Sequence, residues 1–232
     1  MGVKSALRAA GLVLAFPFLL TACFFSPGAF TSTLDIGRDR SFTFTYVGEV
    51  IVTDPGSQAG EGFAQGLSDA VAGQSPEALA EPSPRRPAEI GEARRQAIIE
   101  ALTREAGYRS VDYVGDNKFR VDYSVSGRLD RNFVYPINLD APSVIPWIAV
   151  EVRQDGTARM TAMAFGDPPG GTAGQPGADS ANEQRRGTFT LTTDADLVMH
   201  NNEEGTAPGD RATVTWRITP TTQAAPRAVV RF

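Results

Sequence analysis

Residues 108–127, which read YRSVDYVGDNKFRVDYSVSG, contain two runs of alternating side chains separated by the tripeptide Gly115-Asp116-Asn117. Alternation with a period of two is typical of a β-strand with one buried face, and Gly, Asp and Asn favour a turn. The pattern therefore predicts two antiparallel strands, over residues 108–114 and 118–127. The side chains expected on the buried face of the second strand are Phe119, Val121, Tyr123 and Val125.

The same alternation recurs on both sides of this hairpin. Residues 41–53 place Phe42, Phe44 and Tyr46 on one face, and they are expected to pair with residues 31–36 through a turn at 37–40. Residues 147–153 and 157–165 form the clearest further hairpin, because Asp155-Gly156 supplies the positive φ that a tight turn needs. Further strands are expected over residues 133–137, 188–194, 196–200, 211–219 and 228–232.

One helix is expected, over residues 89–106. Its apolar side chains recur at helical spacing, Pro87 suits its start, and Gly107 suits the left-handed position after its end. Strands dominate the rest of the chain, and most of the hairpins are local. The fold class that follows is α+β, a mainly antiparallel β-sheet with one main amphipathic helix.

Two segments lack this patterning. Residues 54–88 and 166–187 are rich in Gly, Pro, Ala and Ser, and neither has an apolar period. Such composition and length are typical of flexible insertions, so we expect both segments to be disordered. Residues 30–232 are expected to form a single α+β domain around them, and this domain is long enough to bury a core without disulfide bonds.

The first 22 residues have the pattern of a secretory signal peptide. Lys4 and Arg8 precede the apolar run AAGLVLAFPFLL at residues 9–20, which is too short to span a bilayer as a helix. Leu20-Thr21-Ala22-Cys23 then resembles the lipobox of bacterial lipoproteins, in which an apolar residue and two small residues precede a cysteine. The resemblance implies cleavage between Ala22 and Cys23 and acylation of Cys23, for example with palmitate. Residues 23–29 are then a lipidated tether to the membrane.

The order of the mature elements carries a second resemblance. TSTLDI, a turn, FTFTYVGE, a helix, GYRSVDYVGDNKFRVDYSVSGRLDRNFVYP, a hairpin, GTFTLTTDADLVMHNN and VTWRI are together similar to an uncharacterised family of bacterial cell-envelope lipoproteins. That family has no known activity. In lipoproteins of cells with two membranes, an Asp after the acylated cysteine marks inner-membrane retention. Phe24 at this position therefore implies the outer membrane, with the domain facing the periplasm.

Composition excludes several kinds of chemistry. The 232 residues include one Cys and one His, which excludes a disulfide framework, a Cys-based zinc site and chemistry that needs two histidines. Removal of residues 1–22 takes two of the 22 cations and none of the 27 acidic residues, which leaves a net charge of 20 − 27 = −7. An acidic domain of this kind lacks the basic footprint of a nucleic-acid partner. No nucleotide-binding glycine motif is present, and we expect neither a cofactor nor a metal.

Carboxylates are the remaining groups that could carry catalysis, because a pair of them can hydrolyse a glycoside without His or Cys. The alternative is that they face solvent on strands and loops. The candidates are Asp112, Asp122, Asp130 and Asp140.

Two further groups leave alternatives open. Asp194, Asp196 and His200 share a parity along the chain and suit a divalent metal, although a solvated strand edge is the better explanation. The connection APSVIPW at residues 141–147 is apolar, so Ile145 and Trp147 could contact a lipid, a membrane or a partner. The alternative is that Trp147 packs on the core where the next strand begins.

These features favour a non-enzymatic, membrane-anchored envelope lipoprotein that binds a lipid or an envelope protein partner. The alternative is a carboxylate-dependent hydrolase that acts on envelope glycans. The two differ in geometry, because glycoside hydrolysis requires two carboxyl groups about 5–10 Å apart in a cleft. An apolar groove or a flat sheet favours binding instead.

Overall fold

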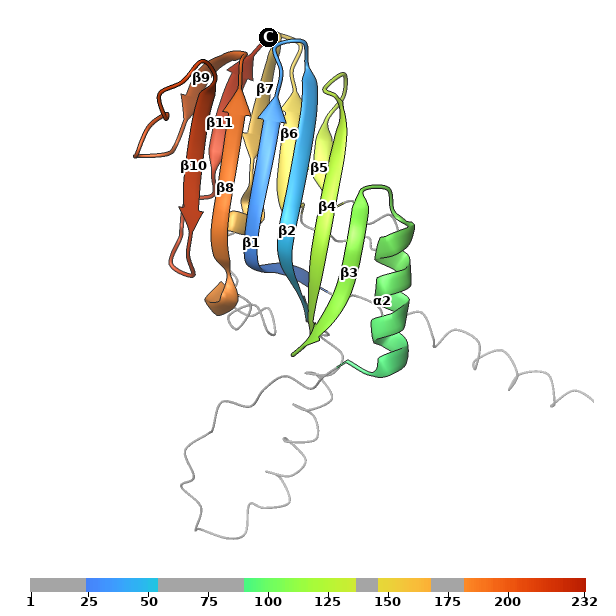
Figure 1. Cartoon of the computed structure of the whole chain (residues 1–232). Coiled ribbons are helices and arrows are strands. Elements are labelled where there is room, and N and C mark those ends of the chain that lie inside the picture. The colour runs from blue at the N-terminus through green and yellow to red at the C-terminus, as the bar shows by residue number, and fades with distance from the viewer. Residues whose placement is uncertain (1–23, 54–89, 137–145, 168–181) are drawn as a thin grey trace, which may run out of the picture.

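The structure is a computed structural model that describes residues 24–53, 90–136, 146–167 and 182–232. Two β-sheets pack face to face with the core between them, and a helix lies beside one edge of the larger sheet (Figure 1). This architecture confirms the expected α+β class. The larger sheet has the order β10 (Ala212–Ile218), β8 (Arg186–Thr193), β1 (Phe24–Ile36), β2 (Ser41–Thr53), β4 (Lys118–Arg128) and β3 (Tyr108–Gly115). The smaller sheet has the order β5 (Phe133–Tyr135), β6 (Ile148–Val152), β7 (Thr157–Thr161), β11 (Arg227–Arg231) and β9 (Asp196–His200).

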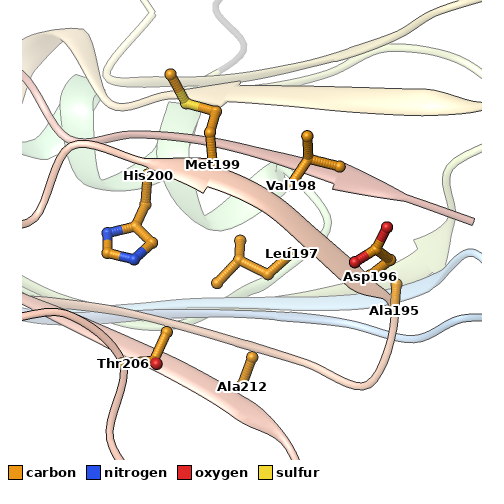
Figure 2. Close-up of a pocket in the computed structure, with 8 residues that line it drawn as sticks. All are labelled: Ala195, Asp196, Leu197, Val198, Met199, His200, Thr206 and Ala212. Atoms are coloured by element: carbon orange, nitrogen blue, oxygen red, sulfur yellow. The ribbon is translucent and has the colours of Figure 1, made fainter.

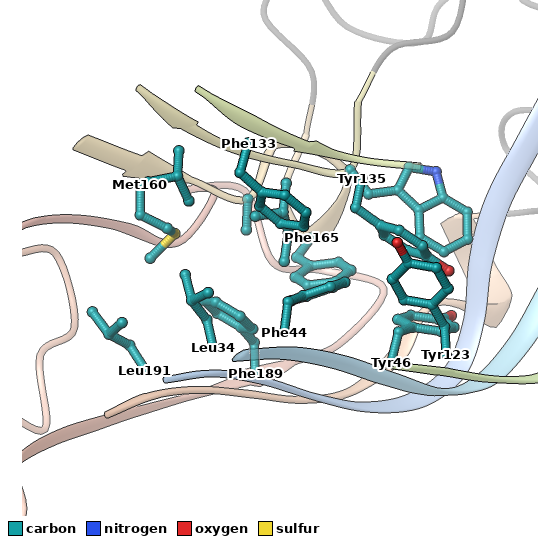
Figure 3. Packing of buried hydrophobic residues seen from close by; sticks show 14 of the residues in the cluster. Leu34, Phe44, Tyr46, Tyr123, Phe133, Tyr135, Met160, Phe165, Phe189 and Leu191 are labelled. Atoms are coloured by element: carbon teal, nitrogen blue, oxygen red, sulfur yellow. The ribbon is translucent and has the colours of Figure 1, made fainter. Parts of the chain in front are cut away.

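The strands β2 and β4 bury the faces that alternation predicts. Phe44 and Tyr46 of β2 are fully buried, as are Phe119 and Val121 of β4, and the two strands pair antiparallel. Aromatic rings fill much of the space between the sheets, as Figure 3 shows. The ring of Phe44 lies 5.0 Å from that of Tyr135 in the opposite sheet, measured between centroids. Burial of this many rings is the main stabilising contribution to the fold.

The expected helix is present but shorter than predicted. α2 (Glu92–Arg104) lies within residues 89–106 and packs against β3, with Ile98 buried. Just before the helix, the N–H of Ile90 donates to the side-chain oxygen of Asn117 over 2.7 Å. Asn117 has a φ of 57° in the turn between β3 and β4, a conformation that Asn tolerates better than most residues. The helix is therefore fixed to the hairpin that it covers.

The first strand begins earlier than the sequence indicates. Residues 24–29, expected to be a tether, belong to β1, where Phe25 pairs with Val52 and Pro27 with Val50. The tether prediction was wrong because Ser-Pro-Gly usually interrupts a strand, whereas here a bulge between Pro27 and Phe30 accommodates it. Phe24, the first described residue, is therefore already part of the larger sheet.

Phe30 lies between two glycines of the neighbouring strands. In the register of the sheet it is opposite Gly48 of β2 and Gly187 of β8. A Cβ on Gly48 would lie 2.6 Å from the Cα of Phe30, and a Cβ on Gly187 would collide with the carbonyl oxygen of Phe30. The ring of Phe30 stacks on Tyr46 and Phe165 at centroid distances of 5.5 and 4.3 Å. The absence of a side chain on both glycines allows this close approach.

The larger sheet is mixed, because β1 and β8 pair in parallel. The strands expected at 188–194 and 196–200 are present as β8 and β9, but they belong to different sheets. The chain crosses between the sheets at Thr193, whose hydroxyl donates to the carbonyl of Ile36 over 2.7 Å and accepts the N–H of Ala195 over 3.0 Å. The polar residues at 194–196 therefore mark a crossing between layers.

The second expected insertion is packed at both of its ends. Residues 54–88 and 168–181 lie outside the described part of the chain. Arg185, however, is only 2% exposed, and its guanidinium donates to the carbonyl oxygens of Gly166 over 2.8 Å and Thr222 over 3.1 Å. The boundaries 166–187 were wrong because this buried arginine joins the two ends of the segment to the connection after β10.

Candidate functional site

Several residues singled out from the sequence lie outside the described residues. They are Ala22 and Cys23 of the expected cleavage and lipidation site, Asp140 among the carboxylates, and Ile145 of the apolar connection. The resemblance of residues 20–23 to a lipobox therefore rests on the sequence alone. The residue that follows Cys23 is described, because Phe24 is the first residue of β1.

Trp147 is a core residue. Its side chain is 2% exposed, and its ring lies 5.2 Å from Tyr46 and 5.8 Å from Tyr135 between centroids. The indole N–H donates to the carbonyl oxygen of Phe25 over 3.1 Å. The sequence left open whether Trp147 contacts a ligand or packs on the core, and in the structure it packs on the core.

The three described carboxylates lie on strands and loops at the surface. A carboxylate oxygen of Asp122 is 2.8 Å from the guanidinium of Arg109, and one of Asp130 is 3.6 Å from that of Arg128. Asp112 is exposed on β3. These ion pairs and exposures match the solvent-facing alternative for all three positions.

The side chains of Asp194, Asp196 and His200 point to different partners. Asp194 accepts the N–H of Arg38 over 2.7 Å, whereas Asp196 lies 3.5 Å from an arginine at the end of β11. His200 accepts a backbone N–H at its Nδ1 atom over 3.2 Å. Within the part of the chain that the structure describes, no three His, Cys, Asp or Glu side chains could share a metal ion.

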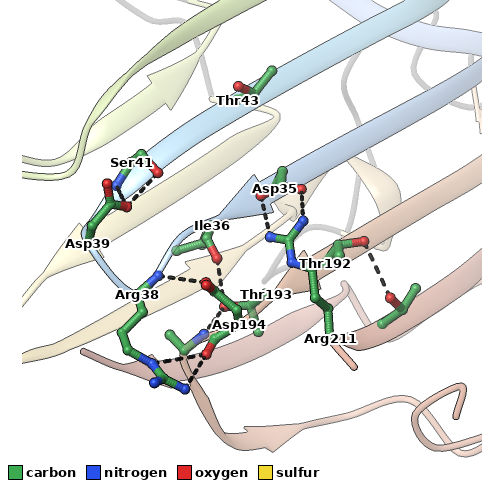
Figure 4. A network of polar contacts seen from close by, with 12 residues as sticks. Asp35, Ile36, Arg38, Asp39, Ser41, Thr43, Thr192, Thr193, Asp194 and Arg211 are labelled. Atoms are coloured by element: carbon green, nitrogen blue, oxygen red, sulfur yellow. Dashed lines mark hydrogen bonds and ion pairs between the residues drawn. The ribbon is translucent and has the colours of Figure 1, made fainter. Parts of the chain in front are cut away.

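A polar network covers the end of the sandwich where β1 turns into β2, as Figure 4 shows. Asp35 and Arg211 form two hydrogen bonds of 2.6 Å each, which join β1 to the start of β10. Arg38 donates from its backbone and from its guanidinium to Asp194, so the turn at 37–40 is joined to the crossing between β8 and β9. The hydrogen bonds to Asp35 raise the pKa of Arg211. The charged side chains of this network are hydrogen-bonded to groups within it, which is the arrangement expected of a structural network.

A hollow of about 590 Å³ opens on one side of the sandwich, beside β9 at the edge of the smaller sheet. We call it the lateral hollow. Figure 2 shows Leu197 and His200 of β9 pointing across it toward Thr206 and Ala212. The lining residues are Ala195, Asp196, Leu197, Val198, Met199, His200, Thr206 and Ala212.

β9 presents two adjacent apolar side chains to solvent at the lateral hollow. Val198 is 44% exposed and Met199 is 50% exposed. Met199 pairs with Val229 of β11, whereas Val198 has no partner residue there because a bulge interrupts the register. Within the described residues, no strand pairs with the other edge of β9. Its backbone N–H and C=O groups on that edge could therefore receive an added strand.

Sequence reasoning found the strand but not the hollow. It singled out Asp196 and His200 for their polar groups, whereas the exposed apolar residues between them distinguish this edge. The available signal was the run Leu197-Val198-Met199, which breaks the alternation of a strand with one buried face.

None of the helices that the structure describes has both the length and the apolar character needed to cross a bilayer. No protein-family model and no curated protein matches the sequence. Among solved structures, the folded domain of LppM from Mycobacterium tuberculosis, determined by NMR, matches with a TM-score of 0.31 and 10% sequence identity. The match covers 90% of this chain and 92% of that chain. Similarity at this level establishes neither a common fold nor a common ligand.

Proposed function

We propose that this chain is a non-enzymatic lipoprotein of the bacterial cell envelope, which binds an extended segment of a partner protein along β9. The observation that carries the proposal is the edge of β9, which pairs with no other strand among the described residues, with Val198 and Met199 exposed beside it. Proteins that act alone usually cover such an edge or place charges on it, because an open edge pairs with other chains. A peptide added to β9 would gain backbone hydrogen bonds and side-chain contacts in the lateral hollow.

The composition of the lateral hollow favours a peptide over a lipid. It combines the apolar Leu197 and Ala212 with the polar Asp196, His200 and Thr206. A small-molecule or acyl-chain site is usually enclosed and mainly apolar, with few polar groups. A peptide instead brings hydrogen-bonding groups and side chains together, which suits an open and mixed surface.

The proposed membrane attachment is supported by the sequence. Cys23 is the only cysteine of the chain, and it follows Leu20-Thr21-Ala22 in the order of a lipobox. Acylation would anchor the protein stably, since two or more acyl chains are enough to do so. With Phe24 rather than Asp after the cysteine, the proposed location is the outer membrane, with the domain facing the periplasm.

The variant Cys23→Ser tests the attachment. In a host with lipoprotein-processing enzymes, the variant should keep residues 1–22 and take up no radiolabelled palmitate, whereas the wild type should be cleaved and labelled. Equal labelling of the two proteins would exclude acylation at Cys23.

Site-specific crosslinking tests the partner site on β9. A photoreactive amino acid in place of Val198, in the full-length protein in its envelope, should give an adduct with a peptide segment of an envelope protein. Met199→Lys should abolish the adduct, because a lysine beside an open edge opposes the addition of a strand. Val114→Lys is the matched control, since Val114 is 41% exposed on β3, an edge strand of the other sheet. An adduct that survives Met199→Lys, or no adduct at all, would contradict the proposal.

A further inference from the structure

We infer that acylation of Cys23 holds one end of the sandwich against the bilayer and directs the other end into the aqueous space. A lipid surface is thus a second partner of the domain, and it sets the orientation in which β9 meets its own partner. The inference rests on the proposed anchor at Cys23 and goes beyond it, because an anchor on a long tether would set no orientation.

No flexible linker separates Cys23 from the first residue of β1. Phe24 follows Cys23 in the chain, so their Cα atoms are about 3.8 Å apart. Phe24 is already paired with Thr53, and Phe25 with Val52. The carbonyl of Phe25 also accepts the indole N–H of the buried Trp147 over 3.1 Å. The residue that carries the acyl chains is therefore attached directly to the sheet and to the core.

We call the end of the β-sandwich that lies beside Cys23 the membrane end. β1 begins there with Phe24, and β2 ends there with Thr53. On the same side of the sandwich, β8 begins with Arg186 level with Ala29, and β10 ends with Ile218 level with Phe30. Figure 1 shows β1 and β8 running away from this end and β2 and β10 returning to it.

The opposite end, which we call the distal end, contains the turn at 37–40 between β1 and β2. The guanidinium of Arg40 lies 5.0 Å from the ring centroid of Phe232, and the N–H of Phe232 donates to the carbonyl of Gly156 over 3.1 Å. The turn between β6 and β7 and the last residue therefore lie beside the turn at 37–40. The seven residues of β1 from Phe30 to Ile36, at about 3.3 Å each, place the distal end roughly 23 Å beyond the level at which β8 begins and β10 ends.

The edge of β9 lies between the membrane end and the distal end. Asp196 at the start of β9 pairs with Arg231, the residue before Phe232, so β9 begins at the distal end. Its unpaired edge runs along the side of the sandwich. A bilayer at the membrane end therefore leaves the lateral hollow open to the aqueous side, where a partner segment can reach it.

Two single-cysteine variants test the orientation. Because Cys23 is the only cysteine and is proposed to be acylated, an introduced cysteine provides the only free thiol. Gln223 is exposed in the connection between β10 and β11 at the membrane end, and Gln154 is exposed in the turn between β6 and β7 at the distal end. Full-length acylated Gln223→Cys and Gln154→Cys are labelled with nitrobenzoxadiazole and reconstituted into phosphatidylethanolamine–phosphatidylglycerol vesicles that contain a lipid with a nitroxide headgroup.

The label at position 223 should be quenched at least about threefold more strongly than the label at position 154, because roughly 20 Å of strand separates the levels of the two labels. Insertion of twenty Gly and Ser residues between Cys23 and Phe24 is the matched control. A flexible linker of that length has a root-mean-square span of about 25 Å, so the ratio of quenching should fall to about one.

Equal quenching of the two labels without the linker would overturn the inferred orientation, as would a contrast that survives the linker. A protein that does not float with the vesicles at all has no acyl anchor. That result would overturn the proposed attachment itself, so the two failures are distinguishable.

Discussion

Trp147 joins the two sheets close to the membrane end, and its removal should be costly. The ring packs on Tyr46 and Tyr135, and its N–H is bonded to Phe25. Trp147→Ala should lower the free energy of unfolding by about 3–5 kcal/mol, since it leaves a cavity in the core. Val134→Ala, at a residue that is 36% exposed on β5, should change it by less than about 0.5 kcal/mol. Urea denaturation midpoints measure both effects, and a small loss for Trp147→Ala would mean that the ring is not part of the core.

Buried tyrosines make the stability of the domain sensitive to alkaline pH. Burial raises the pKa of Tyr108 to about 12 and raises that of Tyr46 and Tyr135 well above the ordinary value of 10.0. The folded state keeps these protons at a pH where the unfolded chain releases them. Their contribution to stability is therefore complete below pH 10 and is lost as the pH rises through the folded-state values. The free energy of unfolding should fall steeply between pH 10 and about 12.

Tyr46→Phe isolates one of these groups. The hydroxyl of Tyr46 donates to the carbonyl of Glu49 over 2.7 Å, so the variant should lose about 1 kcal/mol at neutral pH. Above pH 10, its stability should decline less steeply than that of the wild type by about 1.4 kcal/mol per pH unit, which is the contribution of one titrating group. Urea denaturation at a series of pH values gives both slopes, and identical slopes would contradict the assignment.

Among the elements, β1 depends on glycines in both of its neighbours. Gly48→Ala and Gly187→Ala would each place a methyl group against the backbone of β1 at Phe30, and each should destabilise the domain by about 1–3 kcal/mol. Gly209→Ala is the control, because a Cβ there would approach no atom nearer than 3.7 Å. Thermal unfolding of the three variants compares them directly, and equal melting temperatures would mean that β1 can move away from its neighbours without cost.

Local patterns predicted the individual elements more accurately than their boundaries. Alternation identified the buried faces of β2 and β4, because a side chain's face depends only on its parity within the strand. The start of β1 and the boundaries of the second insertion were displaced by several residues, because a bulge determines the first and a buried arginine the second. Alternation cannot detect either feature, because each depends on residues far away in the chain.

Strand order, and with it the candidate site, could not be predicted from these patterns. β1 pairs in parallel with β8, more than a hundred residues away, and no local pattern specifies such a pairing. The edge position of β9 follows from the same topology, so Val198 and Met199 gained their significance only in the folded chain. The proposed lipobox is the opposite case, because the pattern that suggests it lies entirely within residues 20–23.

At the scale of the whole molecule, the point where the folded unit begins distinguishes a rigid attachment from a tether. A form of the domain that begins at residue 30 lacks the pairing of Phe25 with Val52 and the acceptor for the indole N–H of Trp147. It should be less stable than a form that begins at residue 24 by about 2–4 kcal/mol, from the lost burial of the Phe25 ring and the lost hydrogen bond. Phe25→Ala in the longer form keeps the carbonyl and should give an intermediate value.

Urea denaturation of these three purified forms, without the signal peptide or the acyl chains, measures the difference. We expect the highest midpoint for the form that begins at residue 24, an intermediate one for its Phe25→Ala variant, and the lowest for the form that begins at residue 30. Equal midpoints for the long and short forms would mean that residues 24–29 do not remain paired in solution. Those residues would then be a tether of about 20 Å when extended. The domain could rotate on such a tether, and Cys23 would no longer determine which end faces the bilayer.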